Sequence, residues 1–460
     1  MDKKVLVIGA ARSGVAVSNL LMNHGKKVIL TDNRAEDLVL AEFPQIREQM
    51  KALEAKGIET VFGKQIDTDI VSGLEQIVIS PGVPLTIPVI VAAKAAGIPV
   101  IGEVELCYQL TKTPFIAITG TNGKTTTTTL TGEIFAASGR KTYTVGNIGD
   151  PISNYVGASE PEDVFVAEIS AFQLDTIIDF RPRGAAILNL SPDHLDRYGV
   201  MENYVAAKAR IFENQGAGDF LVLNADDPQV YALGQSAKCE KYYFSLDKKV
   251  AKGAYTMDGV IYVNDGVKSQ PVCAVSEVGI KGPHNVQNAL AATVLAYFSG
   301  VAADVIAGAL KAFKGVEHRQ EFVATVKGVD YINDSKGTNT NATITALNAM
   351  TKPVILIAGG YDKKENYDDF MDVAKGKVKR MILLGDTAGD IEACAVRKGY
   401  LNTVRVKDYE EAVRVAAGCA VPGDVVLLSP ACASWDMFDN YEIRGRVFKD
   451  FVKRLGASDE

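Results

Sequence analysis

The chain of 460 residues is 47% apolar and carries a formal net charge of −7. This length predicts about three domains, and the apolar fraction is typical of a globular protein with large buried cores. Because the chain is acidic and has no cluster of lysines and arginines, we expect no nucleic-acid partner.

The cysteines and the apolar segments indicate the compartment. The six cysteines lie far apart, with no pair at metal-ligand spacing, so we expect reduced and mostly buried thiols. The sequence enters a strand at once, without the pattern of a signal peptide. Residues 288–313 are the most apolar region, but Ser299 and Asp304 interrupt it, so no membrane insertion is expected. We therefore predict a cytoplasmic protein and take a monomer as the expected state.

The first predicted elements form a β-α-β unit. A strand over residues 3–8 leads to a glycine-containing turn, a helix to about residue 23, and a strand over 27–30 that ends near Asp32. An acid in this place is typical of dinucleotide sites, but Ala11 replaces the glycine that lets a pyrophosphate approach. The pattern therefore disfavours a nicotinamide cofactor, while the helix start at Ser13 still predicts an anion site. Strands over 76–79 and 99–101 complete this part, which we end at residue 102.

Residues 115–126 predict a nucleotide site. An apolar strand over 115–119 leads through a glycine-containing loop into a Thr-rich helix. In such loops backbone N–H groups and the helix N-terminus hold phosphates, Lys124 adds a positive charge, and the Thr125 hydroxyl binds Mg²⁺. An ordinary glycine turn is the alternative. Gly-Lys-Thr at a strand–helix junction favours a nucleoside triphosphate.

Polar residues follow the next two strands. Glu168 ends the strand that starts at residue 164, and His194 follows a strand over 185–190. The carboxyl ends of parallel strands meet at one edge of a sheet, where a carboxylate can bind Mg²⁺. A solvated acid is the alternative for Glu168, a surface residue for His194, and a solvated helix lysine for Lys208. Asn285 begins an Ala-rich helix, where asparagine is also a frequent N-cap.

A third series of alternating strands and helices follows residue 315. Its strands are predicted over 329–332, 353–358, 381–384 and 425–428. Polar residues again collect after the strands, which is typical of a doubly wound sheet with a binding edge.

The short phosphate loop, in which Ile118 stands where the general pattern has glycine, resembles that of Mur ligases and folylpolyglutamate synthases. Further matches to Mur ligases are Gly146-Asn147-Ile148-Gly149, the segment around His194, the helix around Lys208, and residues 333–342. The resemblance spans about residues 5–445, and its N-terminal part argues against folylpolyglutamate synthases. It implies an α/β protein with three domains: Rossmann-like 1–102, a P-loop ATPase-like mostly parallel sheet in 103–315, and Rossmann-like 316–460.

The resemblance also implies roles for individual residues. The UDP part of the substrate would contact Arg12, Ser13, Asp32, Asn33, Arg34, Ser80, Gly82 and Asn147. ATP would contact Gly120, Thr121, Asn122, Gly123, Lys124, Thr125, Thr126, Asn285, Asn288, Arg319 and Asp334. Two Mg²⁺ ions would be held by Thr125, Glu168, His194 and Lys208, the last as a CO₂-derived carbamate. The incoming amino acid would contact Thr338, Lys363, Ser434 and Phe438. Lys124, Glu168, His194, Lys208 and Lys336 would act in catalysis.

Residues 429–445 resemble the Mur ligases that add D-glutamate to UDP-N-acetylmuramoyl-L-alanine. The implied reaction uses ATP, passes through an acyl phosphate, releases ADP and phosphate, and serves peptidoglycan precursor synthesis. A sibling ligase that adds another amino acid, such as L-alanine to UDP-N-acetylmuramate, is the first alternative. A nicotinamide-dependent oxidoreductase and a non-catalytic ATP-binding switch are further alternatives from other classes.

Overall fold

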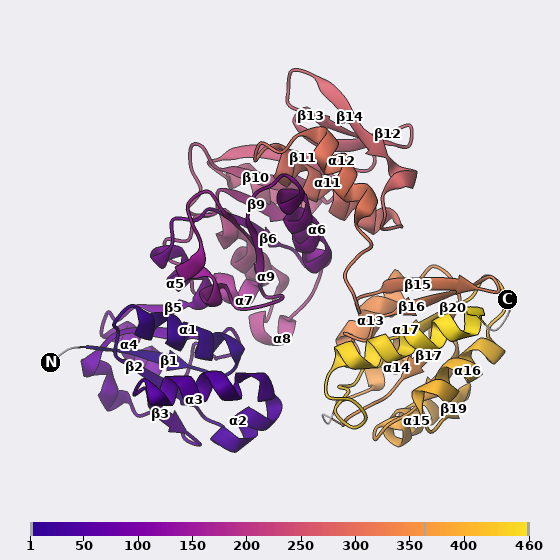
Figure 1. Ribbon diagram of the computed structural model, residues 1–460, viewed down its shortest axis with the longest axis horizontal. Helices are drawn as coiled ribbons and strands as arrows, with labels where there is room; N and C mark the ends of the chain where they lie inside the picture. Colours follow the sequence, from indigo (N-terminus) through magenta and orange to yellow (C-terminus); the bar gives the residue numbers. More distant parts are fainter. Residues whose placement is uncertain (1–2, 363–364, 458–460) are drawn as a thin grey trace. The chain divides into compact units, whose positions relative to one another are not determined.

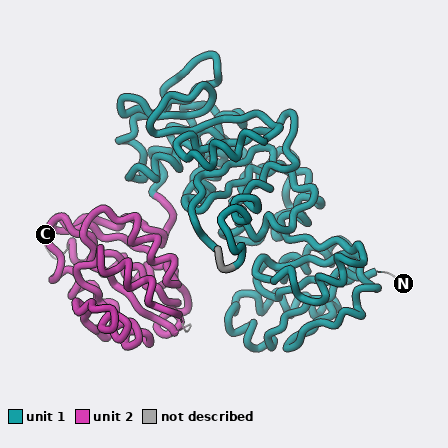
Figure 2. Tube along the Cα trace, turned by 180° about the vertical axis from the view of Figure 1, so that it is seen from behind, with its two compact units in different colours: residues 1–314 teal, residues 315–460 magenta. Residues whose placement is uncertain are grey.

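The computed structural model describes residues 3–362 and 365–457, apart from the side chains of Leu195, Asp196 and Ala457. The chain forms two compact units, Met1–Lys314 and Gly315–Glu460 (Figure 2). The first unit contains a five-stranded and a nine-stranded sheet, and the second contains a six-stranded sheet. Each sheet is mostly or entirely parallel, and helices cover its faces, so the α/β prediction is confirmed.

The five-stranded sheet is entirely parallel, in the order β3-β2-β1-β4-β5. The strands β1 and β2 are apolar and buried on both faces, as central parallel strands must be. Helices α1, α2 and α3 pack on one face and α4 packs on the other. The elements are β1 (Lys4–Ile8), α1 (Arg12–Asn23), β2 (Val28–Asp32), α2 (Glu36–Glu42), α3 (Arg47–Ala55), β3 (Glu59–Phe62), β4 (Leu74–Ile79), α4 (Pro88–Ala95) and β5 (Val100–Gly102).

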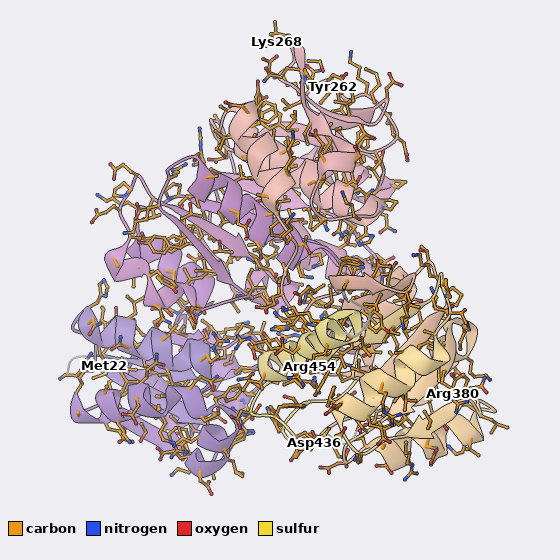
Figure 3. All side chains as sticks on the ribbon, turned by 45° about the vertical axis from the view of Figure 1, so that its right-hand side comes forward. Met22, Tyr262, Lys268, Arg380, Asp436 and Arg454 are labelled. Atoms are coloured by element: carbon orange, nitrogen blue, oxygen red, sulfur yellow. The ribbon has the colours of Figure 1, made fainter. Side chains whose placement is uncertain are left out.

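The nine-stranded sheet has the order β14-β13-β12-β11-β10-β9-β6-β8-β7, with antiparallel pairing only within β12-β13-β14. Tyr262 and Lys268 mark this antiparallel part in Figure 3. Its strands are β6 (Phe115–Thr119), β7 (Thr142–Gly146), β8 (Val164–Glu168), β9 (Gly184–Ile187), β10 (Phe220–Asn224), β11 (Glu240–Ser245), β12 (Gly253–Met257), β13 (Val260–Asn264) and β14 (Ser269–Ala274).

Helices of the first unit cover this large sheet. Helices α6, α11 and α12 pack together beside it (Figure 1). The strand β6 lies between β8 and β9, so the loops after these three strands meet at one edge. The helices are α5 (Glu103–Leu110), α6 (Lys124–Ala137), α7 (Ala171–Leu174), α8 (Leu195–Tyr198), α9 (Met201–Ala209), α10 (Pro228–Leu233), α11 (Pro283–Tyr297) and α12 (Ala303–Ala312).

The six-stranded sheet of the second unit has the order β15-β16-β20-β17-β18-β19, and only β15 is antiparallel. Helices α13, α14 and α15 share one core cluster, while α16 and α17 share the other. The elements are β15 (Glu321–Val326), β16 (Val329–Asn333), α13 (Thr340–Ala349), β17 (Val354–Ala358), α14 (Asp368–Lys377), β18 (Val378–Leu383), α15 (Ala388–Arg397), β19 (Thr403–Arg405), α16 (Tyr409–Cys419), β20 (Val425–Leu428) and α17 (Tyr441–Ala457).

Most predicted elements are present, with some differences. The strands β3, β7, β15 and β19 were not predicted, and β9 ends at Ile187 rather than at residue 190. Five of the six cysteines are buried and all six are free thiols, as expected. Within the described part of the chain, no helix has the length and hydrophobicity needed to cross a bilayer.

Candidate active site

The loop between β6 and α6 has the backbone geometry of a phosphate-binding loop. Gly120 and Gly123 have φ of 150° and 81°, values that glycine adopts without a Cβ penalty. Gly123 is the N-cap of α6, and Thr126 lies in the first turn. Lys124 Nζ donates to the carbonyls of Gly120 at 3.0 Å and Thr121 at 2.8 Å. The lysine charge is therefore held over the loop that would receive phosphates.

The segment after β9 anchors this loop. Thr121 N donates to Asn189 O at 3.0 Å, and Asn122 N donates to Asn189 Oδ1 at 2.8 Å. Asn189 Nδ2 donates back to Asn122 O at 3.0 Å, and Ser191 N donates to Thr121 Oγ1 at 3.0 Å. Thr121 and Asn122 are thus hydrogen-bonded to the segment after β9.

Glu168 lies at the end of β8 and is 2% exposed. Its Oε2 accepts a hydrogen bond of 2.7 Å from Thr125 Oγ1, and its Oε1 accepts one of 3.0 Å from Asn147 Nδ2. The solvated-acid alternative is therefore wrong. A buried carboxylate beside a threonine hydroxyl supplies the hard oxygen donors that Mg²⁺ prefers, so these residues fit a magnesium site.

Lys208, on α9, is 1% exposed rather than solvated. Its Nζ donates to Gly120 O at 2.8 Å and lies 4.6 Å from the centre of the Tyr204 ring. Burial, together with the nearby charge of Lys124, lowers the pKa of Lys208 to about 7. A large fraction of this amine is therefore neutral near physiological pH.

His194 does not join the network around Glu168. Its side chain is 49% exposed and lies 3.6 Å from Asp193. Its ring centre lies 4.8 Å from that of Phe172 and 6.4 Å from that of Tyr204. Its backbone has a φ of 52° and its carbonyl accepts the N–H of Arg197. The surface interpretation of His194 fits this structure, and its predicted role as a metal ligand stays a prediction.

The two asparagines of α11 differ in their surroundings. Asn288 is buried, accepts a 3.2 Å hydrogen bond from Thr127 Oγ1, and leaves no room for a Cβ on Gly123, which would be 2.3 Å from Asn288 Oδ1. Asn285 lies in the first turn, because α11 begins at Pro283 and no side chain caps it. The N-cap interpretation of Asn285 is therefore wrong.

Asp32, at the end of β2, is almost fully buried. It accepts hydrogen bonds from the N–H of Ala10 at 3.0 Å and from the Arg34 guanidinium at 2.8 Å. Burial alone would raise the pKa of Asp32, but these bonds and the Arg34 charge lower it. Asp32 and Arg34 therefore form an ion pair, and Asp32 holds the turn after β1 through the N–H of Ala10.

The start of α1 contacts α5 and the segment after β7. Ser13 Oγ donates to the buried Glu103 at 2.6 Å, and Arg12 donates to Gly149 O at 2.6 Å. Ser153 donates to the other Glu103 oxygen at 2.7 Å. Of the remaining residues predicted at this edge, Asn33 and Gly82 are exposed and Ser80 lies beside Gly9.

In the second unit, Asp334 follows β16 and is 5% exposed. It accepts hydrogen bonds from Ser429 Oγ at 2.6 Å and from Gln320 N at 3.1 Å. Burial raises the pKa of Asp334 to about 6, although the charge of Arg319 opposes that shift. The next turn places Lys336 Nζ 5.9 Å from the Tyr441 ring.

The predicted amino-acid contacts lie in two loops of the second unit. Thr338 N donates to Lys336 O at 2.8 Å. Ser434 is 2% exposed, and its carbonyl accepts the N–H of Phe438 at 2.8 Å. The Phe438 ring lies 5.2 Å from that of Tyr409. Lys363 lies outside the described residues.

One other group of described residues has the spacing of metal ligands. It comprises Glu317, His318 and Glu321. Lys449 Nζ already contacts Glu317 at 2.7 Å and Glu321 at 2.8 Å, and Asn333 lies 2.9 Å from His318 Nδ1. We assign this group to an ion-pair network rather than to a metal.

Comparisons with known proteins agree with this geometry. Three domain families match: Mur ligase MurD-like, N-terminal domain (residues 3–102), Mur ligase middle domain (118–296), and Mur ligase, glutamate ligase domain (318–432). The chain belongs to the Mur ligase family. It is 46% identical over 455 residues to a UDP-N-acetylmuramoylalanine–D-glutamate ligase of Thermoanaerobacter sp. and 45% identical over 456 residues to that of Clostridioides difficile. At least 98% of each chain is covered.

Solved Mur ligase structures share the fold of this chain. The UDP-N-acetylmuramate-alanine ligase of Thermotoga maritima matches with a TM-score of 0.55 at 19% identity and covers 99% of each chain. A pseudomurein peptide ligase type C of Methanothermus fervidus matches with a TM-score of 0.56 at 19% identity, over 98% of this chain and 100% of its own.

Sequence reasoning missed residues that hold this Mur ligase together. Arg444 is 0% exposed, and its guanidinium donates to Ser335 O at 2.8 Å and to Ala433 O at 3.0 Å. It therefore links the loop after β16 to the loop after β20. An arginine in an otherwise amphipathic helix gives no sequence signal of burial, and neither Asn189 nor Glu103 stands in a glycine-rich motif.

Proposed function

We propose that this Mur ligase uses ATP to join D-glutamate to UDP-N-acetylmuramoyl-L-alanine, releasing ADP and phosphate, as a step of peptidoglycan precursor synthesis. The observation that carries the proposal is full-length similarity, at 46% identity, to an enzyme named for that reaction. We also propose that the protein is cytoplasmic and monomeric and that its substrates are small molecules.

In this proposal three segments of the chain bind different parts of the substrates. Residues 1–102 would bind the UDP part, with Arg12, Ser13, Asp32, Asn33, Arg34, Ser80 and Gly82, joined by Asn147. Residues 103–315 would bind ATP through the phosphate loop, Asn285 and Asn288. Residues 316–460 would supply Arg319, Asp334 and Lys336 toward ATP and Thr338, Lys363, Ser434 and Phe438 toward D-glutamate.

The donor set in the first unit fits magnesium. Thr125 and Glu168, joined at 2.7 Å, would hold one Mg²⁺, and His194 with carbamylated Lys208 would hold a second. When bound, these ions neutralise phosphate oxygens so that an anionic nucleophile can approach.

The environment of Lys208 supports its carbamylation. Only the neutral amine attacks CO₂, forming an N–C bond and releasing one proton. Burial and Lys124 lower the pKa of Lys208 to about 7, so neutral amine is available. The resulting carbamate oxygens would be hard ligands at the phosphate loop.

The chemistry requires activation of a carboxylate. The alanyl carboxylate of the substrate attacks the γ-phosphorus of ATP, the bond to the bridging oxygen breaks, and ADP leaves with an acyl phosphate formed. The amine of D-glutamate then attacks the acyl carbon, loses a proton, and phosphate departs. Lys124 Nζ already lies on the loop carbonyls and would stabilise the negative charge of the phosphoryl group during its transfer. Such transfers depend on positioning and electrostatic stabilisation.

The test is amino-acid-dependent phosphate release with UDP-N-acetylmuramoyl-L-alanine, ATP and Mg²⁺, comparing D- with L-glutamate and with L-alanine. We expect release only with D-glutamate. Lys124→Ala should lower the rate by at least about 10²-fold, as loss of a transition-state donor does, with the fold retained by circular dichroism. Release without the nucleotide substrate, or a preference for another amino acid, would contradict the proposal.

A further inference from the structure

Arg197, on the short helix α8, contacts two other segments of the first unit, the loop after β4 and the segment around α7. Its Nη1 donates to the carbonyl of Pro81 at 3.0 Å, in the loop after β4. Its Nη2 lies 3.6 Å from Asp175 Oδ2, just after α7. Its guanidinium carbon lies 4.1 Å from the centre of the ring of Phe172, on α7 itself. One side chain thus joins the loop after β4 of the five-stranded sheet to the α7 segment, which connects β8 and β9 of the nine-stranded sheet.

Phe172 is shared between Arg197 and His194. The His194 ring centre lies 4.8 Å from that of Phe172, and the Tyr198 ring lies 5.8 Å from it. Arg197 N also donates to His194 O at 3.1 Å. Because the guanidinium stacks on the same ring, the position of Phe172, and through it that of the histidine, depends on Arg197.

The chemistry of the contacts suits arginine alone. The planar guanidinium stacks on Phe172 while its two outer nitrogens reach the Pro81 carbonyl and the Asp175 carboxylate in different directions. A lysine carries a single point charge and cannot make these three contacts together. The Arg197 side chain is 26% exposed, so its contacts are partly shielded from water.

We propose that Arg197 is a positioning residue: it links the loop that carries Ser80 and Gly82 to the α7 segment that follows Glu168, and so aligns the nucleotide-sugar substrate with the phosphate-binding loop. This inference rests on the proposed function, which places the UDP part of the substrate beside Ser80. Arg197 itself touches no reacting atom. It acts through the Pro81 carbonyl on one side and through Phe172 on the other.

The test compares Arg197→Met and Arg197→Lys with a matched control, Arg140→Met. Arg140 also donates to a backbone carbonyl, Glu162 O at 2.8 Å, and lies 5.7 Å from an aromatic ring, that of Phe135. It precedes β7 and so lies at the amino ends of the strands. Losing one hydrogen bond of ordinary strength changes a binding constant by about tenfold. We therefore expect KM for UDP-N-acetylmuramoyl-L-alanine to rise about tenfold in both Arg197 variants.

The remaining readouts separate positioning from stability. KM for ATP should stay within about twofold in the Arg197 variants, as should both KM values in Arg140→Met. If Arg197→Met lowers the thermal midpoint but leaves both KM values unchanged, the proposal is wrong. Phe172→Leu removes only the stacking partner of Arg197 and should raise KM for UDP-N-acetylmuramoyl-L-alanine by less than about tenfold. An unchanged KM in this variant would also contradict the proposal.

A binding measurement distinguishes failure of this inference from failure of the proposed function. Calorimetric titration with UDP-N-acetylmuramoyl-L-alanine needs no turnover. If the unaltered protein turns over no ATP yet binds this nucleotide, and Arg197→Met weakens binding about tenfold, the ligase assignment fails and the positioning role stands. If the affinity of Arg197→Met equals that of the unaltered protein, the positioning role fails.

Discussion

Lys208 shows how much a single side chain can change its chemistry through burial. Its amine lies against the Gly120 carbonyl and the Tyr204 ring, and its pKa is lowered to about 7. We expect ligase activity to depend on dissolved CO₂, because the proposed carbamate needs it. Activity should fall in CO₂-depleted buffer and return on addition of bicarbonate, measured as phosphate release at constant pH.

Two substitutions sharpen this prediction. Lys208→Arg keeps a cation but cannot be carbamylated under these conditions, so its activity should not respond to bicarbonate. The activity should be at least about 10²-fold lower than that of the unaltered protein, because losing a metal ligand costs more than losing a residue that only supports one. Lys281→Arg, which changes a lysine whose Nζ donates to the carbonyls of Ser276 and Val278, should respond to bicarbonate like the unaltered protein. A bicarbonate response in Lys208→Arg would contradict the carbamate.

Asp334 gives a prediction for stability against pH. Burial raises the pKa of Asp334 to about 6 from 3.8, so the folded state binds this proton more strongly than the unfolded state does. The free energy of unfolding therefore falls as pH rises from about 4 to about 6, by an amount on the order of 3 kcal/mol. Relative to Asp334→Asn, which does not ionise here, the unaltered protein should lose this much stability across that range.

The measurement is urea unfolding between pH 4 and pH 7.5, followed by fluorescence of Trp435, the only tryptophan of the chain and a residue of the second unit. Asp369→Asn, which changes an exposed carboxylate on α14, is the control and should leave the profile unchanged. A difference between the unaltered protein and Asp334→Asn that stays constant with pH would refute the argument.

At the scale of elements, the junction of β6 and α6 depends on the packing of α11. A methyl group on Gly123 would lie 2.3 Å from Asn288 Oδ1, and φ there is 81°. We expect Gly123→Ala to displace Asn288 and to raise KM for ATP by at least about tenfold, the effect of losing one well-placed contact. The measurement is the ATP dependence of phosphate release.

Gly139→Ala is a matched control for this junction. Gly139 follows the same helix with a φ of 83°, but a methyl group there would meet nothing within 4 Å. Both variants should lose roughly 1–2 kcal/mol of stability to backbone strain, whereas only Gly123→Ala should affect ATP. Equal KM values for ATP in the two variants would show that the contact with Asn288 is irrelevant.

Elements with a strong local signal were predictable, and those that depend on distant partners were not. The strands β6 and β8 are apolar runs that end in polar residues, so both strands and the positions of Thr125 and Glu168 followed from the sequence. The strand β3 reads Glu-Thr-Val-Phe and lies half-exposed at a sheet edge, where the apolar pattern is weak. Lys208 reads as a solvated helix residue because its burial comes from packing against the phosphate loop, more than 80 residues away in sequence.

At the scale of the whole molecule, each unit has its own core. In the second unit, alternate residues of β17 face opposite core clusters: Leu356 packs with α13, α14 and α15, while Ile357 packs with α16 and α17. Arg444 adds a buried link within the same unit, between the loops after β16 and β20. A core on both faces of a sheet is what an independently folding domain needs.

We therefore expect residues 315–460 to fold when produced alone. Their Trp435 fluorescence transition in urea should agree with that of the full chain to within about 0.5 kcal/mol, because the reporter and its core lie in the same unit. Arg444→Met, which leaves buried carbonyls without donors, should destabilise both the fragment and the full chain by about 1–3 kcal/mol. A fragment without a cooperative transition would show that the second unit requires the first. A transition that Arg444→Met leaves unchanged would remove the proposed link between the two loops.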